Sequence, residues 1–163
     1  MLTTIKLKAK DRSCKAFFGF YFGLSFLEDV QQPHDQIRLY ELTLSCRSLK
    51  TVAASYGKRL GEIAYIFCSD EKILEVNRQY LQHDYYTDII TFDYCEGDRL
   101  SGDLFISLDT IRTNAEQFAD NNYERELYRV IIHGILHLCG INDKGPGERE
   151  IMEEAENKAL AMR

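Results

Sequence analysis

The stretch over residues 128–143, YRVIIHGILHLCGIND, constrains the fold of this chain more than any other. It is an apolar segment with good helical character, and it carries His133 and His137 four positions apart. Residues at that spacing project from one face of a helix on successive turns, so both imidazole rings can reach one ion. Gly140 can adopt the left-handed conformation that ends a helix, and the chain can then turn back and bring Asp143 to the same ion.

Two imidazoles and a carboxylate make three protein ligands, which leave the fourth position of a tetrahedral Zn²⁺ open for water, as in catalytic zinc sites. Polar rings inside an apolar run need a partner, which favours a metal over two histidines satisfied by backbone or water. We therefore predict a metal site made of His133, His137 and Asp143. Gly134 stands where the zinc-peptidase pattern H-E-x-x-H has its general-base glutamate, so a peptidase lacks its base. We exclude Cys139 as a ligand, because two positions after His137 it would project to another face of the helix.

The composition is that of one soluble globular domain, with 163 residues, 45% of them hydrophobic and 28% charged. Five cysteines are scattered without a C-x-x-C pair, which favours a reducing, cytoplasmic location over a disulfide framework. The apolar run over residues 16–27 is too short to span a bilayer and no cleavage site follows it, so we predict no membrane segment and no secretion signal. We expect residues 1–22 to be a disordered basic extension and residues 23–163 to be the working domain.

Apolar periodicity and turn residues predict how helices and strands alternate along the chain. Strands are expected over residues 23–27, 62–68, from 89 onward and over 102–108, the last two paired as an antiparallel hairpin. Helices are expected over residues 45–56, after Ser69 and Asp70, over 111–118 with Asp109 as its cap, and over 123–138 and 148–162. The predicted fold is a single α+β domain, a small mixed β-sheet packed with several helices, with the metal site at the end of a central helix.

Three blocks of the sequence resemble a known family. The run HGILHLCGIND, residues 133–143, resembles the signature H-G-x-L-H-L-x-G-Y-D-H of the YbeY family, bacterial endoribonucleases linked to rRNA maturation. VNRQYLQHDYYTDIITF, residues 76–92, resembles its L-N-x-x-Y-R-x-x-D-x-x-T-D-V-L-S-F block, and LSGDLFIS, residues 100–107, resembles its L-G-D-I-x-I-S strand. The blocks follow the order and spacing of the family, and the resemblance covers the chain from about residue 23 to its end.

The resemblance implies a metal-dependent endoribonuclease that acts on single-stranded RNA in rRNA maturation and ribosome quality control. It implies one zinc ion per chain, a cytoplasmic location, and ribosomal RNA and the ribosome or its small subunit as partners; the oligomeric state is left open. Two positions depart from the family pattern. Asp143 replaces the third metal-binding histidine, and a carboxylate shifts preference toward harder divalent metals. Leu81 replaces an arginine considered important for activity, and a leucine cannot bind phosphate.

Further site residues are expected around the same blocks. Arg78 and Lys144 are candidates for binding the RNA phosphates. His83 is the candidate general acid or base, because its unperturbed pKa lies near neutrality and it stands at the head of a block. Thr87 and Asp88 are expected to order their loop or to hydrogen-bond the metal ligands. The net charge of −6 does not favour RNA binding. Either basic residues gather into a local patch, or affinity for free RNA is weak and salt-dependent and the ribosome or another protein supplies specificity.

Two other functions are consistent with the sequence. One is a zinc-dependent peptidase or other hydrolase, against which Gly134 argues. The other is a ribosome assembly factor without catalytic activity that keeps the metal for stability, and Leu81 is the feature that supports it.

Overall fold

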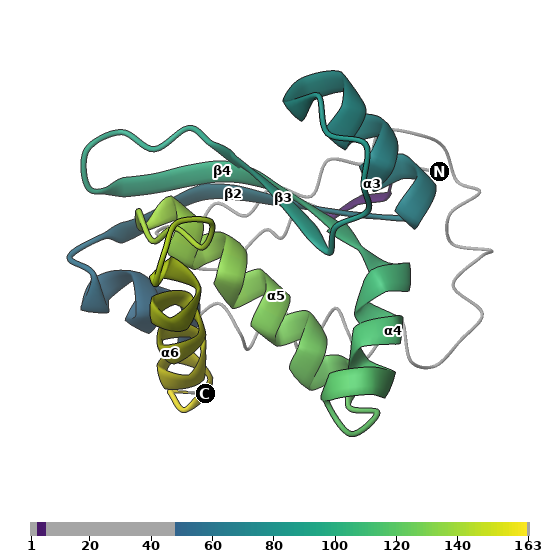
Figure 1. Cartoon of the computed structure of the whole chain (residues 1–163). Coiled ribbons are helices and arrows are strands. Elements are labelled where there is room, and N and C mark those ends of the chain that lie inside the picture. Colours follow the sequence, from purple (N-terminus) through teal and green to yellow (C-terminus); the bar gives the residue numbers. More distant parts are fainter. Residues whose placement is uncertain (1–2, 6–47, 163) are drawn as a thin grey trace.

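The computed structural model describes residues 3–5 and 48–162 (Figure 1). The strand expected over residues 23–27 and the proposed domain boundary at residue 22 lie outside the described residues. The helix expected over residues 45–56 is described only in part, and its residues 48–55 are helical. The sequence predictions that can be compared with the structure therefore concern mainly the part from residue 48 onward.

A four-stranded mixed sheet forms the centre of the fold, with the strand order β1-β2-β4-β3. Its strands are β1 (Thr3–Ile5), β2 (Arg59–Cys68), β3 (Ile89–Asp93) and β4 (Arg99–Ser107). The central strands β2 and β4 are parallel, whereas β1 and β3 pair antiparallel at the two edges. The predicted mixed sheet and the predicted hairpin of the third and fourth strands are confirmed. Strand β1 comes from the segment that we expected to be an extension, and it pairs with β2.

The helices lie on both faces of the sheet (Figure 1). Helix α3 (Asp70–Val76) continues into a π-helical turn, η1 (Asn77–Leu81), and covers one face. The other face is covered by α5 (Tyr123–Leu138), with α4 (Leu108–Phe118) and α6 (Glu148–Leu160) beside it. The α+β prediction is confirmed, and α5 has the predicted bounds. Within the described residues no helix is both long and apolar enough to cross a membrane.

The cap of helix α4 differs from the prediction. Its N-cap is Ser107, the last residue of β4, and the Ser107 hydroxyl accepts the N–H of Thr110 at 3.2 Å. Asp109 instead accepts the backbone N–H of Asp70 at 3.1 Å, so it supports the start of α3. The strand therefore leads into the helix without a loop, and the sequence pattern placed the helix start too late.

The main core lies between the sheet and α5. Most of α5 is buried, and its apolar side chains pack on the inner residues of the strands, among them Ile63, Tyr65, Leu100, Leu104 and Ile106. A smaller cluster on the other face packs α3 against the sheet, with Cys68, Ile73, Val76 and Ile90. Strand β2 is apolar on both sides toward its C-terminal end, because both faces are covered there, as its EIAYIFC run indicated. Strand β4 alternates instead, with Leu104 buried and Asp103 partly exposed.

Gly134 allows α5 to approach the sheet closely. A Cβ atom at this position would lie 2.7 Å from Cδ1 of Ile89 and 3.0 Å from Cδ2 of Leu104. Both of those side chains are buried, so they have little room to move away. The glutamate of the zinc-peptidase pattern would therefore not fit between α5 and strands β3 and β4.

Replacing Gly134 by alanine is expected to lower the free energy of unfolding by about 1 kcal/mol, because overpacking outweighs the gain in helix propensity. Urea unfolding monitored by circular dichroism measures this change. Adding Ile89→Val removes the Cδ1 atom that lies nearest, so the double variant should regain part of the loss. A Gly134→Ala protein as stable as the wild type would contradict this account of the packing.

Candidate metal centre

Helix α5 ends in a turn that builds half of the site. Gly140 has φ 95°, and its N–H donates to the carbonyl of His137 at 2.9 Å while the N–H of Ile141 donates to Leu136 at 3.1 Å. These two bonds define a Schellman motif, which glycine favours because of its positive φ. The turn reverses the chain, so the Ile141 carbonyl lies 2.9 Å from Nδ1 of His137. The next residues then return to the histidine face and place Asp143 there.

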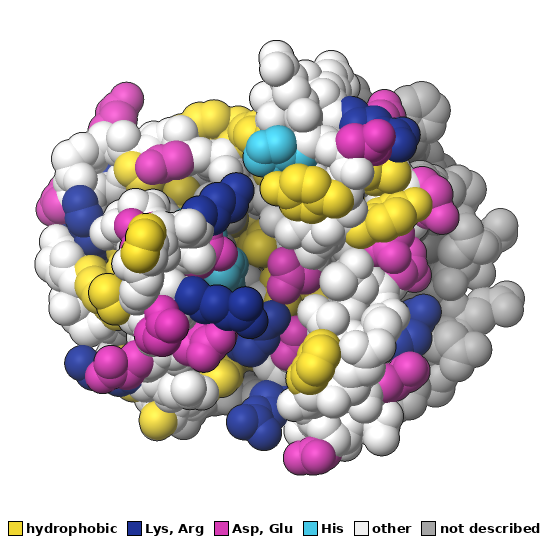
Figure 2. Space-filling view, in the orientation of Figure 1, with side chains coloured by type: hydrophobic (Ala, Val, Ile, Leu, Met, Phe, Trp, Pro, Cys, Tyr) yellow, Lys and Arg dark blue, Asp and Glu magenta, His cyan; other side chains and the backbone are white. Residues whose placement is uncertain are grey.

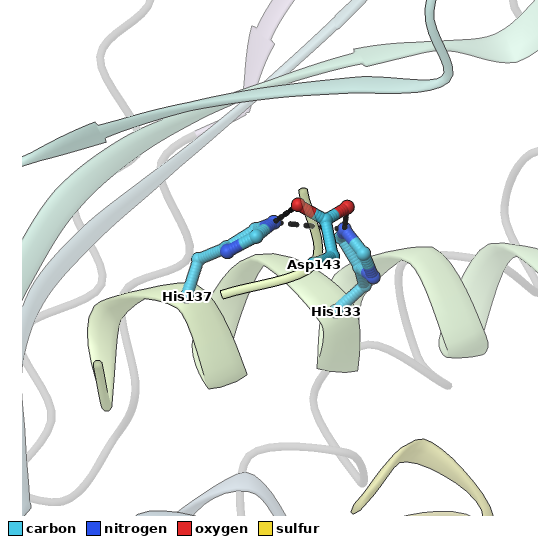
Figure 3. A group of neighbouring side chains, drawn as sticks. All are labelled: His133, His137 and Asp143. Carbon is cyan, nitrogen blue, oxygen red and sulfur yellow. Dashed lines mark hydrogen bonds and ion pairs between the residues drawn. The ribbon is translucent and has the colours of Figure 1, made fainter. Parts of the chain in front are cut away.

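His133, His137 and Asp143 converge at this end of α5 (Figure 3). The Nε2 atoms of the two histidines lie 2.9 Å apart. The Asp143 carboxylate oxygens lie 3.5 Å from Nε2 of His133 and 3.9 Å from Nε2 of His137. One ligand atom from each residue lies within 4.8 Å of the others, and all three side chains are partly buried. The three residues predicted from the spacing are thus brought together.

The outer hydrogen bonds of the histidines fix which nitrogen atoms carry a proton. A backbone carbonyl can only accept, so Nδ1 of His137 must donate to Ile141. Nδ1 of His133 lies 2.6 Å from a carboxylate oxygen of Glu156, which also accepts. In the neutral rings both Nε2 atoms then carry lone pairs, which face each other beside the Asp143 carboxylate. Three electron-rich donors in contact repel one another, so this donor set fits a bound cation.

The pKa values of His137 and Glu156 are both shifted. Burial lowers the pKa of His137, and the neighbouring His133 lowers it further, which favours the neutral imidazole. Burial alone would raise the pKa of Glu156, but the hydrogen bond from His133 and the charge of Arg129 outweigh it and lower the pKa. His137 is therefore available as a ligand, and Glu156 is available as an ionised acceptor.

Arg129 stands behind the histidines at the centre of an ionic cluster. Its guanidinium donates to Glu126 at 2.8 and 2.9 Å, to Glu156 at 3.1 and 3.3 Å, and to Asp88 at 3.2 Å. Burial alone would lower the pKa of Arg129, but these hydrogen bonds and charges raise it, so the side chain is charged. Three carboxylates around one guanidinium leave an excess of negative charge beside His133, which also favours a cation there.

The three residues lie in an open cleft of about 910 Å³. Strand β3 and the loop before it form one wall, and the turn after α5 with the start of α6 forms the other. Figure 2 shows histidine, basic and acidic side chains gathered around the hollow on this face. The cleft gives an extended ligand access to the three converging residues. The residues of the two walls include Leu81, His83, Tyr85, Thr87, Asp88, Thr91, Asp93, Asn142, Lys144, Glu148, Arg149 and Glu153.

The two cations predicted to bind phosphate lie in different places. Lys144 lines the cleft beside the third ligand. Arg78 is paired at 2.6 Å with Asp84 on the surface and is absent from the described residues that line the cleft. Lys144 therefore lies beside the three converging residues, whereas Arg78 lies outside the lining of the cleft.

The other predicted residues all line the cleft. His83 stacks on Tyr85 with ring centroids 5.1 Å apart, and its Nδ1 lies 2.9 Å from the tyrosine hydroxyl. Thr87 donates to the carbonyl of Ile89 at 3.2 Å and so orders the loop before β3. Asp88 contacts Arg129, through which it is linked to Glu156 and His133.

The structure also places Leu81, which stands where the family pattern has an arginine, and Cys139, which we excluded as a ligand. Leu81 is 43% exposed and lines the cleft, so the position of the family arginine faces the site with an apolar side chain. Cys139 is the C-cap of α5, and burial raises the pKa of its thiol to about 11. A thiol with that pKa is a poor ligand at neutral pH, which agrees with its exclusion.

Sequence reasoning missed Glu156, the role of Arg129 and the Ile141 carbonyl. Helix α6 carries several other glutamates, so Glu156 does not stand out by composition. The available signal was its position, since it shares a buried face of the helix with Met152, Ala155 and Ala159. A carboxylate on a buried face needs a partner, and here the partners are a histidine and an arginine.

Comparison with known proteins gives the same family that the sequence resembles. Residues 27–162 match the family model described as endoribonuclease YbeY. The chain is 91% identical over 115 residues to endoribonuclease YbeY of Bacteroides thetaiotaomicron, a match covering 71% of this chain and 83% of that protein. It is 60% identical over 111 residues to endoribonuclease YbeY of Porphyromonas gingivalis strain W83, covering 68% and 73%.

A solved structure is similar as well. The solution structure of TM1509 from Thermotoga maritima matches with a TM-score of 0.54 and 30% sequence identity, over 74% of this chain and 79% of that one. The matched family model covers most of the chain and includes every residue of the candidate metal centre. The chain therefore belongs to the endoribonuclease YbeY family, a family of enzymes that hydrolyse RNA.

Proposed function

We propose that this protein is a zinc-dependent endoribonuclease that cleaves single-stranded ribosomal RNA during ribosome maturation and quality control in the cytoplasm. The observation that carries the proposal is the convergence of two Nε2 lone pairs and a carboxylate inside an open cleft. His133, His137 and Asp143 would hold one ion and leave a coordination position free. Such an ion, when bound, polarises a phosphoryl oxygen or lowers the pKa of its water.

The residues of the chain support zinc more than a harder metal. Two imidazole nitrogens suit zinc, whereas magnesium and calcium prefer sites made of oxygen ligands alone. The single carboxylate of Asp143 is compatible with zinc and also with manganese. Metal-free protein reloaded separately with Zn²⁺ or Mn²⁺ would show which ion restores cleavage.

The walls of the cleft supply the remaining groups for RNA. Lys144 and His83 both line the cleft. We assign Lys144 to contact a phosphate beside the ion, and His83 to exchange a proton with the RNA or with water. The Tyr85 hydroxyl fixes the orientation of the His83 ring. The family name of the relatives supports RNA as the substrate, and the ribosome or its small subunit is proposed as the partner that presents it.

The test compares cleavage and metal content in the same samples. Single-stranded and duplex rRNA fragments are incubated with the wild type, with chelator-treated protein, and with Asp143→Asn. Chelation should abolish cleavage of the single strand, and Asp143→Asn should weaken metal binding and cleavage together, by at least about 10-fold. Asp93→Asn is the matched control, because it removes a charge from the same cleft outside the three ligands, and it should leave metal content unchanged.

A ribosome assembly factor without catalysis is the second candidate. The observation that favours it is the apolar Leu81 side chain, exposed in the cleft where the family pattern has an arginine. Protein that holds metal and binds ribosomal subunits but cuts no RNA would establish this function instead. Cleavage that persists unchanged after the metal is removed would contradict both the metal dependence and the role given to Asp143.

A further inference from the structure

We propose that Glu156 is a positioning residue for the metal ligand His133, and that Arg129 holds the Glu156 carboxylate in place. The inference rests on the metal site of the proposed function, although it does not depend on which substrate is cleaved. It assigns a role to two residues that neither the signature nor the set of three ligands includes.

Glu156 reaches the site from a different helix. It lies on the inner face of α6, and only 8% of its side chain is exposed. Its Oε1 atom lies 2.6 Å from Nδ1 of His133, whereas Nε2 of the same ring points toward His137 and Asp143. The carboxylate therefore contacts the histidine on the side opposite to the candidate ion.

Arg129 holds the Glu156 carboxylate that contacts the histidine. One terminal nitrogen of the guanidinium donates to both oxygens of Glu156, at 3.1 and 3.3 Å. The rest of the guanidinium is held by Glu126 on the same helix and by Asp88, the residue just before β3. Because Arg129 lies one helical turn before His133 on α5, it connects the two helices and the sheet edge next to the ligand. The Glu156 carboxylate has little freedom to rotate away.

This arrangement has a direct effect on the ligand. A carboxylate that accepts from Nδ1 keeps the proton on that atom, leaves the Nε2 lone pair free, and makes the ring a stronger donor to a metal. The two histidines differ in this respect. The carbonyl of Ile141, which no side-chain substitution removes, orients His137, whereas a side chain orients His133. Substitution of Glu156 therefore tests how the group that accepts from Nδ1 of a ligand histidine affects metal binding.

The experiment measures zinc affinity by competition with a chromophoric chelator and records the visible absorption of the Co²⁺-loaded protein. Glu156→Gln keeps the size of the side chain and removes its charge. We expect its zinc affinity to fall by about 10- to 100-fold, because His133 becomes a weaker donor. The Co²⁺ spectrum should also change, because His133 contributes to the ligand field at the ion. Glu153→Gln is the matched control, since it makes the same change on the same helix in the same cleft but contacts Arg149 and not a histidine. Its affinity should stay within about 2-fold of the wild type.

Folding is checked separately by thermal unfolding of the metal-free proteins. If Glu156→Gln does not fold, Glu156→Asp serves in its place, because it keeps the charge but is one methylene too short to contact both Arg129 and His133. We expect it also to weaken zinc binding and to change the Co²⁺ spectrum. Wild-type affinity and spectrum in a folded variant would overturn the proposal, and so would an equal loss in Glu153→Gln.

The outcomes also separate this inference from the proposed function. A protein whose zinc affinity depends on Glu156 but that cleaves no RNA would refute the nuclease and leave the positioning role intact. A wild-type protein that binds no zinc or cobalt would refute both.

Discussion

Replacing His137 by alanine is expected to reduce zinc affinity by more than about 100-fold. Removing only a residue that hydrogen-bonds a metal ligand already lowers affinity by about 10- to 100-fold, and in our proposal His137 is itself a ligand. RNA cleavage should fall to the level of the chelator-treated protein, because the remaining His133 and Asp143 are two ligands and catalytic zinc sites use three. Metal analysis of the purified protein and a cleavage assay on single-stranded rRNA measure the two effects. Figure 3 shows that His137 faces His133 and Asp143, so its removal affects the site directly.

The control for this prediction is His83→Ala. His83 lines the same cleft but lies outside the group of three ligands, so its removal should leave the metal content unchanged. If His83 exchanges a proton in the reaction, the variant should cleave RNA more slowly while still holding its metal. Full metal content in His137→Ala would show that this histidine is not a ligand.

Replacing Arg129 by methionine is expected to lower the free energy of unfolding by about 3 kcal/mol, because breaking a buried ionic network leaves charges without a partner. Methionine fills a similar volume, so lost packing contributes little. The side chains of Glu126 and Glu156 are 5% and 8% exposed, and water cannot replace the guanidinium around them. Urea unfolding of the metal-free protein measures the change.

Arg125→Met provides the comparison, because Arg125 lies one turn earlier on the same helix and is exposed. That substitution should change the free energy of unfolding by no more than about 0.5 kcal/mol. If both variants lose the same stability, the ionic cluster has no special role. If Arg129→Met is fully stable but binds zinc poorly, the cluster serves only to orient Glu156.

Part of the fold could be read from the sequence because strong periodicity and clear breaks coincide. Helix α5 was predicted with its observed bounds, since Asn122 caps its start and Gly140 follows its end. The hairpin of β3 and β4 followed from two β-rich runs and the turn between them. The start of α4 was misplaced because Ser107 and Asp109 are both residue types that favour the N-cap, and the pattern does not show which of them the helix uses.

In the candidate site, residues that are close in sequence could be predicted, whereas contacts between separate elements could not. The three ligands lie close together in the sequence, so helix geometry and one glycine were enough to bring them together. Arg78 was an equally reasonable phosphate-binding candidate by position, but its side chain pairs with Asp84. Glu156 contacts its histidine across two helices, and a contact of that kind depends on how the helices pack, which the pattern of one helix does not specify.

Nearly all residues of the metal centre come from one continuous part of the chain, the Schellman turn and the two helices on either side of it. The ligands, the carbonyl that orients one of them and the ionic cluster around Glu156 come, apart from Asp88, from residues 126–156. This portion consists of two helices and the loop between them, so most contacts that bring the ligands together are made between residues close in sequence. The metal centre is therefore expected to tolerate variation in the first part of the chain, where residues 1–26 lie outside the family match.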